Sequence, residues 1–100
     1  MKAKDYADLF QALSEETRVR VVEMLTREKR CACQILEKLE ISQPTLSHHM
    51  RILSAAGLVT AEKRGKWVFY GINEPVFADL KQFVERIGQG TEPCRECRVK

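Results

Sequence analysis

The stretch ISQPTLSHHMRILSAAGL, residues 41–58, has the pattern of a helix with one apolar face and one face of small polar side chains. Ser42 belongs to the residue types that cap helix starts, and Pro44 suits a first turn, where its missing N–H needs no partner. Three residues recur at the spacing of one buried stripe, namely Leu46, Met50 and Leu53. The segment therefore predicts a helix that one face fixes to a core.

The other face of this helix lacks the Lys and Glu of an ordinary solvated face. It carries Gln43, Thr45, Ser47, His48 and Arg51. Small polar side chains around one cation suit contacts with phosphates and base edges. Gly57 then suits the left-handed residue that ends a helix. We therefore expect a recognition helix, with an ordinary amphipathic helix as the alternative.

A second, shorter helix is expected directly before it. Ile35, Leu36 and Leu39 supply a short apolar face that ends near Glu40, and a turn over residues 40–42 joins the two helices. Two short helices joined by so tight a turn are the signature of a helix-turn-helix.

After the recognition helix the spacing of apolar residues changes from a helical pattern to a strand pattern. Residues 58–63 and 67–72 are rich in Val, Phe, Tyr and Trp, which predicts a two-stranded hairpin with a basic tip. A helix-turn-helix followed by such a hairpin is a winged helix. Arg64 and Lys66 are then candidate phosphate contacts, and a merely solvated tip is the alternative.

Helices are also expected at both ends of the chain. The first covers residues 5–13, the next runs from Ser14 to about Arg27 with Arg18 and Arg20 facing solvent, and the last starts at Asn73. The apolar stripe of the last helix is wide for a terminal helix. With the apolar face of the first helix it could form a dimer interface, or both could cover their own core. The predicted fold is mainly α (α+β), with about five helices and a hairpin wing.

The length of 100 residues predicts one domain over residues 1–88, followed by a flexible cysteine-containing tail over residues 89–100. No long apolar run or export leader is evident, so we expect a cytoplasmic protein with no membrane partner. The formal net charge of +3 is mild evidence for a polyanionic partner.

The chain has four cysteines in two close pairs, Cys31 with Cys33 and Cys94 with Cys97. Because the cytosol keeps most thiols reduced, such pairs favour soft-metal ligation or redox chemistry over a disulfide framework. The Cys-x-x-Cys spacing of the second pair also occurs in thiol oxidoreductases. No βαβ pattern surrounds it, so we expect no enzyme. A structural zinc site is a further alternative.

Taken together, these segments resemble the ArsR/SmtB family of bacterial metal- and metalloid-responsive repressors. The resemblance covers residues 6–87, and it is most specific in SQPTLSHHMRILSAAGLV, residues 42–59. LSEETRVRVVEML, residues 13–25, resembles the family's second helix, and RGKWVFYGIN, residues 64–73, resembles its wing. The resemblance implies a homodimer that holds operator DNA when metal-free and is released by an inducer.

The inducer must be argued from the cysteines. The CAC element at Cys31 and Cys33 resembles the Cys-x-Cys element of arsenic- and cadmium-sensing members, which implies As(III) or Sb(III) as inducer, with Cd(II) and Pb(II) as alternatives. Some arsenic sensors have a third cysteine where this chain has Leu36. Cys94 and Cys97 could supply that missing thiolate, or form their own site.

On a regular helix Cys31 and Cys33 would point about 200° apart, so we expect an ion that binds both to unwind that helix end and disturb the recognition helix. A thiol redox or reactive-sulfur switch is the second hypothesis. Adjacent histidines cannot readily share an ion, so His48 is expected to face DNA and His49 to pack within the domain. With no histidine after His49, a histidine-based zinc site on the last helix is disfavoured.

Overall fold

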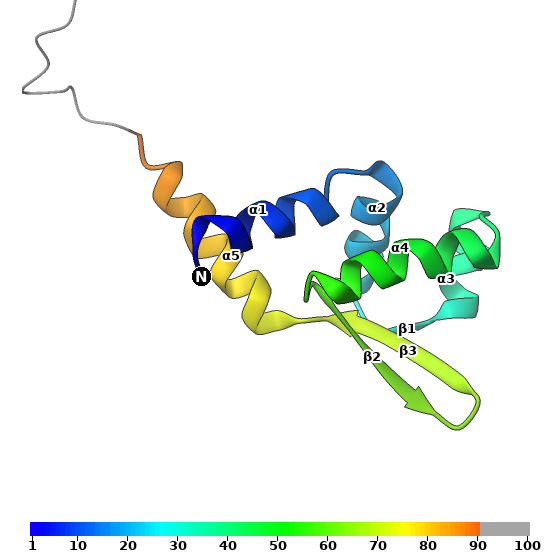
Figure 1. Ribbon diagram of the computed structural model, residues 1–100. Helices are drawn as coiled ribbons and strands as arrows, with labels where there is room; N and C mark the ends of the chain where they lie inside the picture. The colour runs from blue at the N-terminus through cyan, green and yellow to red at the C-terminus, as the bar shows by residue number, and fades with distance from the viewer. Residues whose placement is uncertain (91–100) are drawn as a thin grey trace, which may run out of the picture.

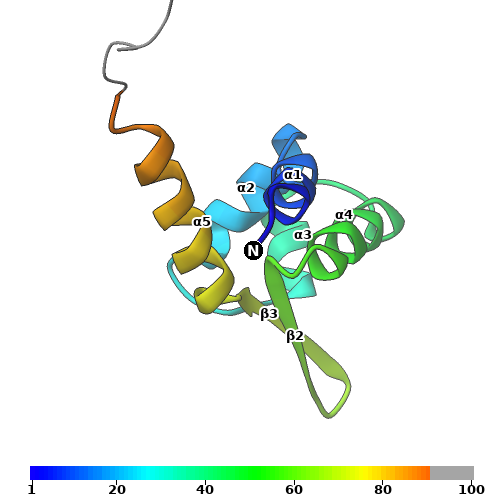
Figure 2. The same cartoon turned by 60° about the vertical axis from the view of Figure 1, so that its left-hand side comes forward.

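The structure is a computed structural model that describes residues 1–90 (Figure 1). Its elements are α1 (Ala3–Ala12), α2 (Glu16–Leu25), β1 (Arg30–Cys31), α3 (Ala32–Leu39), α4 (Gln43–Ala55), β2 (Val59–Arg64), β3 (Trp67–Ile72) and α5 (Glu74–Ile87). The β2–β3 hairpin projects from the helices α2, α3 and α4, as Figures 1 and 2 both show. The predicted order of helices and strands is confirmed.

The helix-turn-helix consists of α3 and α4. Glu40 ends α3 in the left-handed conformation, at φ 54°, and Ser42 caps α4 by accepting a 3.3 Å hydrogen bond from the backbone N–H of Thr45. Gly57 has φ 85° directly after α4, in the region that favours glycine. The capping residues predicted from the sequence therefore set both ends of α4.

The second helix is shorter than its predicted range of residues 14–27. Glu15 caps α2 by accepting a hydrogen bond from the backbone N–H of Arg18, whereas the hydroxyl of Ser14 donates to the carbonyl of Gln11. Ser14 thus closes the end of the first helix instead of starting the second. The prediction that Ser14 begins α2 is wrong by two residues for this reason.

The sheet has one strand more than the predicted hairpin. Its order is β1-β3-β2, and both pairings are antiparallel. In β1, Arg30 lies opposite Tyr70 and Cys31 lies opposite Phe69. So short a strand has no detectable sequence period, but it ties the start of α3 to the wing.

The core lies between α1, α2, the helix-turn-helix and the base of the hairpin, and α5 adds Leu80 to it. Its largest fully buried side chains are Val21, Ile35, Leu53 and Leu58. The helix α4 packs against α2, α3 and β2, and the predicted stripe of Leu46, Met50 and Leu53 is at most 2% exposed. This packing fixes the orientation of the opposite, polar face of α4.

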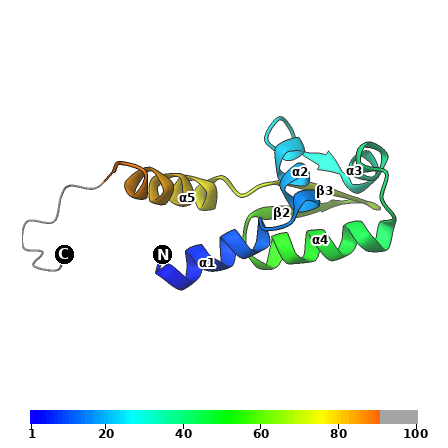
Figure 3. The same ribbon diagram turned by 90° about the horizontal axis from the view of Figure 1, so that it is seen from above.

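The helices α1 and α5 lie on the same side of this body, where α5 projects away from it (Figure 3). The rings of Tyr6 in α1 and Phe83 in α5 stack with centroids 4.0 Å apart. In the wide apolar stripe of α5 only Leu80 is buried, and Val84 and Ile87 are 46% and 64% exposed. Phe10 of α1 is 42% exposed. No helix among residues 1–90 has the length and apolar character needed to span a membrane.

Candidate DNA-binding face and cysteine site

The exposed face of α4 carries the predicted polar side chains. All five are exposed, and they are Gln43, Thr45, Ser47, His48 and Arg51. The rings of His48 and His49 have centroids 5.6 Å apart, with His48 exposed and His49 only 9% exposed. A straight, well-capped helix therefore presents a continuous row of hydrogen-bonding groups and one guanidinium to solvent.

The buried His49 ties α4 to the preceding helices. Its Nδ1 lies 3.2 Å from Nη1 of Arg18, and Nε of Arg18 donates a 2.7 Å hydrogen bond to the carbonyl of Ala12. Arg18 thus bridges the end of α1 and the middle of α4. The prediction that Arg18 faces solvent is wrong because both of these acceptors lie within its reach, whereas Arg20 is exposed as predicted.

Glu15 also faces His49, with 3.5 Å between its Oε2 and Nδ1. Both neighbours cannot bond Nδ1 at once, because a guanidinium only donates and a carboxylate only accepts. Nδ1 accepts from Arg18 when it carries no proton and donates to Glu15 when it does. Partial desolvation opposes ionisation of Glu15, but the backbone N–H groups of Thr17 and Arg18 and the proximity of His49 outweigh it and lower the pKa of Glu15.

The tip of the wing carries the predicted cations, in different surroundings. Arg64 donates to Glu62 at 2.9 Å and lies over the ring of Phe69 at 5.6 Å. The hydrogen bond from Arg64 is the main cause of the lowered pKa of Glu62. Lys66 lies 5.8 Å from the ring of Trp67, which is 50% exposed, and makes no ion pair among residues 1–90.

The alternation of β2 adds a cation that the sequence analysis missed. Ala61 and Tyr70 line a hollow of about 220 Å³ together with Ser47, Arg51 and other residues of α4. Because strand side chains alternate, Lys63 shares the face of Ala61, and Arg64 lies on the opposite face with Glu62. Lys63 is exposed and unpaired within the described part of the chain. The alternation of side chains along residues 59–64 could have identified Lys63 from the sequence.

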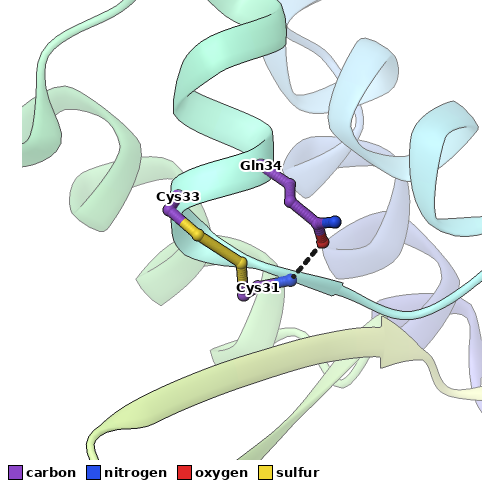
Figure 4. Close-up of a disulfide and its surroundings, with 3 residues drawn as sticks. All are labelled: Cys31, Cys33 and Gln34. Atoms are coloured by element: carbon purple, nitrogen blue, oxygen red, sulfur yellow. Dashed lines mark hydrogen bonds between the residues drawn. A yellow bond between two sulfur atoms is a disulfide. The ribbon is translucent and has the colours of Figure 1, made fainter.

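Cys31 and Cys33 form a disulfide at the start of α3, as Figure 4 shows. Cys31 is 7% exposed and Cys33 is exposed. Cys31 is the N-cap of α3, with φ −78° and ψ 159°, and its backbone N–H donates a 3.1 Å hydrogen bond to Oε1 of Gln34. The expectation that both cysteines lie in a regular helix is therefore wrong. An extended Cys31 brings the two sulfurs together without unwinding α3.

The basic residues before this site are partly neutralised. Nζ of Lys29 lies 3.8 Å from Glu62, and Nη2 of Arg30 lies 3.6 Å from Glu28. Among residues 1–90 no group of three His, Cys, Asp or Glu side chains is placed to hold a metal ion. As thiols, Cys31 and Cys33 would offer two soft donors, which fit a thiophilic ion once the disulfide is reduced. Cys94 and Cys97 lie outside the described residues.

A capped polar helix held by a buried stripe, followed by a basic hairpin, defines a winged helix-turn-helix DNA-binding protein. Residues 15–61 match the family described as "Bacterial regulatory protein, arsR family". An arsenical resistance operon repressor of Staphylococcus aureus is 34% identical over 94 residues, which cover 94% of this chain and 90% of that protein. A homolog of the cadmium resistance regulatory protein CadC, also of Staphylococcus aureus, is 37% identical over 83 residues, covering 82% and 66%.

The same class appears among solved structures. An ArsR-like transcriptional regulator from Rhodococcus sp. RHA1 superposes with a TM-score of 0.76 at 30% identity, over 85% of this chain and 80% of that one. The chain belongs to the ArsR family. It is a DNA-binding transcriptional repressor of that family, and its fold is that of regulators rather than of enzymes.

Proposed function

We propose that the protein represses transcription as a homodimer on operator DNA and is released when As(III) or Sb(III) binds cysteine thiolates. The exposed polar face of α4, from Gln43 to Arg51, supports base and phosphate contacts in a major groove. Lys63 and Lys66 on the wing would bind the phosphate backbone, and Arg64 would add a charge that Glu62 partly offsets. Two recognition helices related by a twofold axis would then read two half-sites.

The exposed apolar side chains of α1 and α5 support dimerisation. Phe10, Val84 and Ile87 lie on the two helices that the Tyr6–Phe83 ring stack joins, outside the core of the domain. Covering them with the same surface of a second copy would remove apolar area from water.

The observation that carries the inducer proposal is the adjacency of the two sulfurs of Cys31 and Cys33. As(III) prefers thiolates and typically three of them, so Cys94 or Cys97 from either subunit would complete the set. Because Cys31 also belongs to β1, paired with Phe69 of the wing, ligation would act on the wing as well as on α3. The similarity to arsenical resistance repressors agrees with this inducer, and the similarity to a CadC homolog keeps Cd(II) as the alternative.

The disulfide favours a second candidate, a thiol redox switch at the same pair. Forming it removes two protons and two electrons from the thiols of Cys31 and Cys33, and an oxidant such as a peroxide or a polysulfide would accept them. This candidate needs no ion.

Both candidates are tested by following operator binding with fluorescence anisotropy under reducing conditions. Arsenite, antimonite, cadmium, lead and zinc are added in turn to the wild type, to Cys31→Ser, to Cys33→Ser and to a Cys94→Ser/Cys97→Ser double variant. Release of the wild type by arsenite, lost in Cys31→Ser and Cys33→Ser, supports the proposal. Release of the double variant as well would exclude the tail as an essential donor.

No release by any ion, with release by peroxide in the absence of metal, would favour the redox switch instead. Ser47→Ala, on the exposed face of α4, is the matched control. It should weaken operator binding in the absence of inducer and leave the ratio of operator affinities with and without inducer unchanged.

A further inference from the structure

A basic pocket lies outside the DNA-binding face, and Arg30 in its lining directly precedes Cys31 in β1. It has a volume of about 440 Å³ and lies between α2, β1 and the end of α3. Its lining includes four cations and one carboxylate, which are Arg20, Arg27, Arg30, Lys38 and Glu23. None of the exposed polar residues of α4 contributes to it, nor does either described cysteine.

Arg30 is the most buried cation of this pocket. Its side chain is only 19% exposed, and its Nε is buried without a hydrogen-bond partner among residues 1–90. Within residues 1–90 its one ion pair is with Glu28, at 3.6 Å. Because Nε is buried, the part of the Arg30 side chain that remains accessible, 19% overall, is what an anion entering the pocket can reach.

The other three cations have no ion-pair partner in the described part of the chain. Arg20 and Arg27 share one face of α2 and its C-terminal extension, and Lys38 approaches from the last turn of α3. Only Glu23 offsets them, and the remaining lining includes the apolar Met24 and Leu39. Converging charges of one sign beside apolar walls favour a multiply charged anion, because both features strengthen the attraction.

We propose that this pocket binds a small phosphate-bearing anion. Arginine forks match phosphate oxygens in bidentate geometry, and three of the four cations are arginines. The volume exceeds what one phosphate group needs and lies in the range of pockets for small organic ligands, of roughly 300–1,000 Å³. A phosphorylated metabolite or a polyphosphate therefore fits better than a single orthophosphate. Backbone phosphates of DNA have the same chemistry, and the experiment must separate the two sources.

The test uses the full chain under reducing conditions at low ionic strength, with inorganic pyrophosphate as the probe and without DNA. Binding is followed by the ¹⁵N–¹H signals of the arginine Nε groups. We expect saturable shifts that include Arg30, and a loss of affinity of at least about tenfold in Arg30→Gln. Arg27→Gln, at an exposed position, should lose roughly threefold to tenfold without a folding defect.

Two further variants test whether charge changes pyrophosphate affinity in the expected direction and only at the pocket. Glu23→Gln removes the opposing carboxylate and should tighten pyrophosphate binding, which no general loss of structure would do. Lys81→Gln removes another exposed cation, on α5 and outside the pocket lining, and should leave the affinity unchanged. Equal losses in Lys81→Gln and Arg27→Gln, or no saturation by pyrophosphate, would overturn the proposal. So would an Arg30→Gln variant that binds pyrophosphate normally but a nonspecific duplex weakly, since the pocket would then serve DNA phosphates.

Discussion

Arg18→Met tests whether the recognition helix is held by the arginine that bridges it to α1. The change keeps an unbranched apolar stem and removes the donors to the carbonyl of Ala12 at 2.7 Å and to Nδ1 of His49 at 3.2 Å. A hydrogen bond contributes a net of about 0.5–1.5 kcal/mol. Because Arg18 is only partly buried, we take values below the top of that range and expect a total loss of about 1.5 kcal/mol. For a domain of this size that lowers Tm by roughly 6–12 °C.

The assay is thermal unfolding by circular dichroism at one fixed protein concentration, since stability and dimerisation are linked. Arg20→Met is the matched control, because Arg20 lies two positions later on α2, is exposed, and makes no hydrogen bond to another described side chain. We expect it to change stability by less than about 0.5 kcal/mol. Operator affinity well below Tm should fall in Arg18→Met and not in Arg20→Met. Equal Tm values for the two variants would refute the bridging role.

Three further predictions concern charge and assembly. Glu15→Gln should destabilise the protein near neutral pH, and its loss of stability relative to the wild type should shrink as pH falls below about 4.5. The reason is that the lowered pKa of Glu15 stabilises the fold only while its carboxylate is ionised. Thermal unfolding of Glu15→Gln, with Glu16→Gln as the control, across pH would check this. Lys63→Gln should reduce the salt dependence of operator binding by about one phosphate contact, whereas Lys81→Gln should leave the slope unchanged. Ile87→Asp should convert the dimer to a folded monomer, which sedimentation velocity would detect.

The helix-turn-helix was predictable because its signals are local. Capping side chains, a glycine after α4 and the stripe of Leu46, Met50 and Leu53 all act within a few residues, and each has the predicted burial or conformation. The hairpin was equally predictable, because the spacing of apolar residues changes from helical to strand-like after α4. Residue patterns of this kind need no knowledge of what packs against them.

Features that depend on distant partners were not predictable. Arg18 looks like any exposed helical arginine in sequence, but a residue 31 positions away supplies its acceptor. The strand β1 is two residues long, too short for a period, and exists because β3 lies beside it. That pairing extends the backbone at Cys31, so the two cysteines do not have the angular separation of about 200° that a regular helix would give them.

The place of Cys31 in β1 leads to a last prediction, which rests on the proposed induction by a cysteine-bound ion. Cys31 lies opposite Phe69, and the ring of Phe69 supports the guanidinium of Arg64 near the tip of the wing. A structural change at the sulfurs can therefore reach Arg64 through Phe69 alone.

Phe69→Leu keeps an apolar side chain in β3 and removes the ring that Arg64 contacts. If the wing transmits induction, this variant should bind operator within a few-fold of the wild type but need more arsenite for release, because a typical coupling free energy of about 1–3 kcal/mol would be reduced. Val68→Leu, on the opposite face of the same strand, is the control. Unchanged release of Phe69→Leu would show that induction passes through α3 alone, since α3 is the other element that the cysteine pair joins.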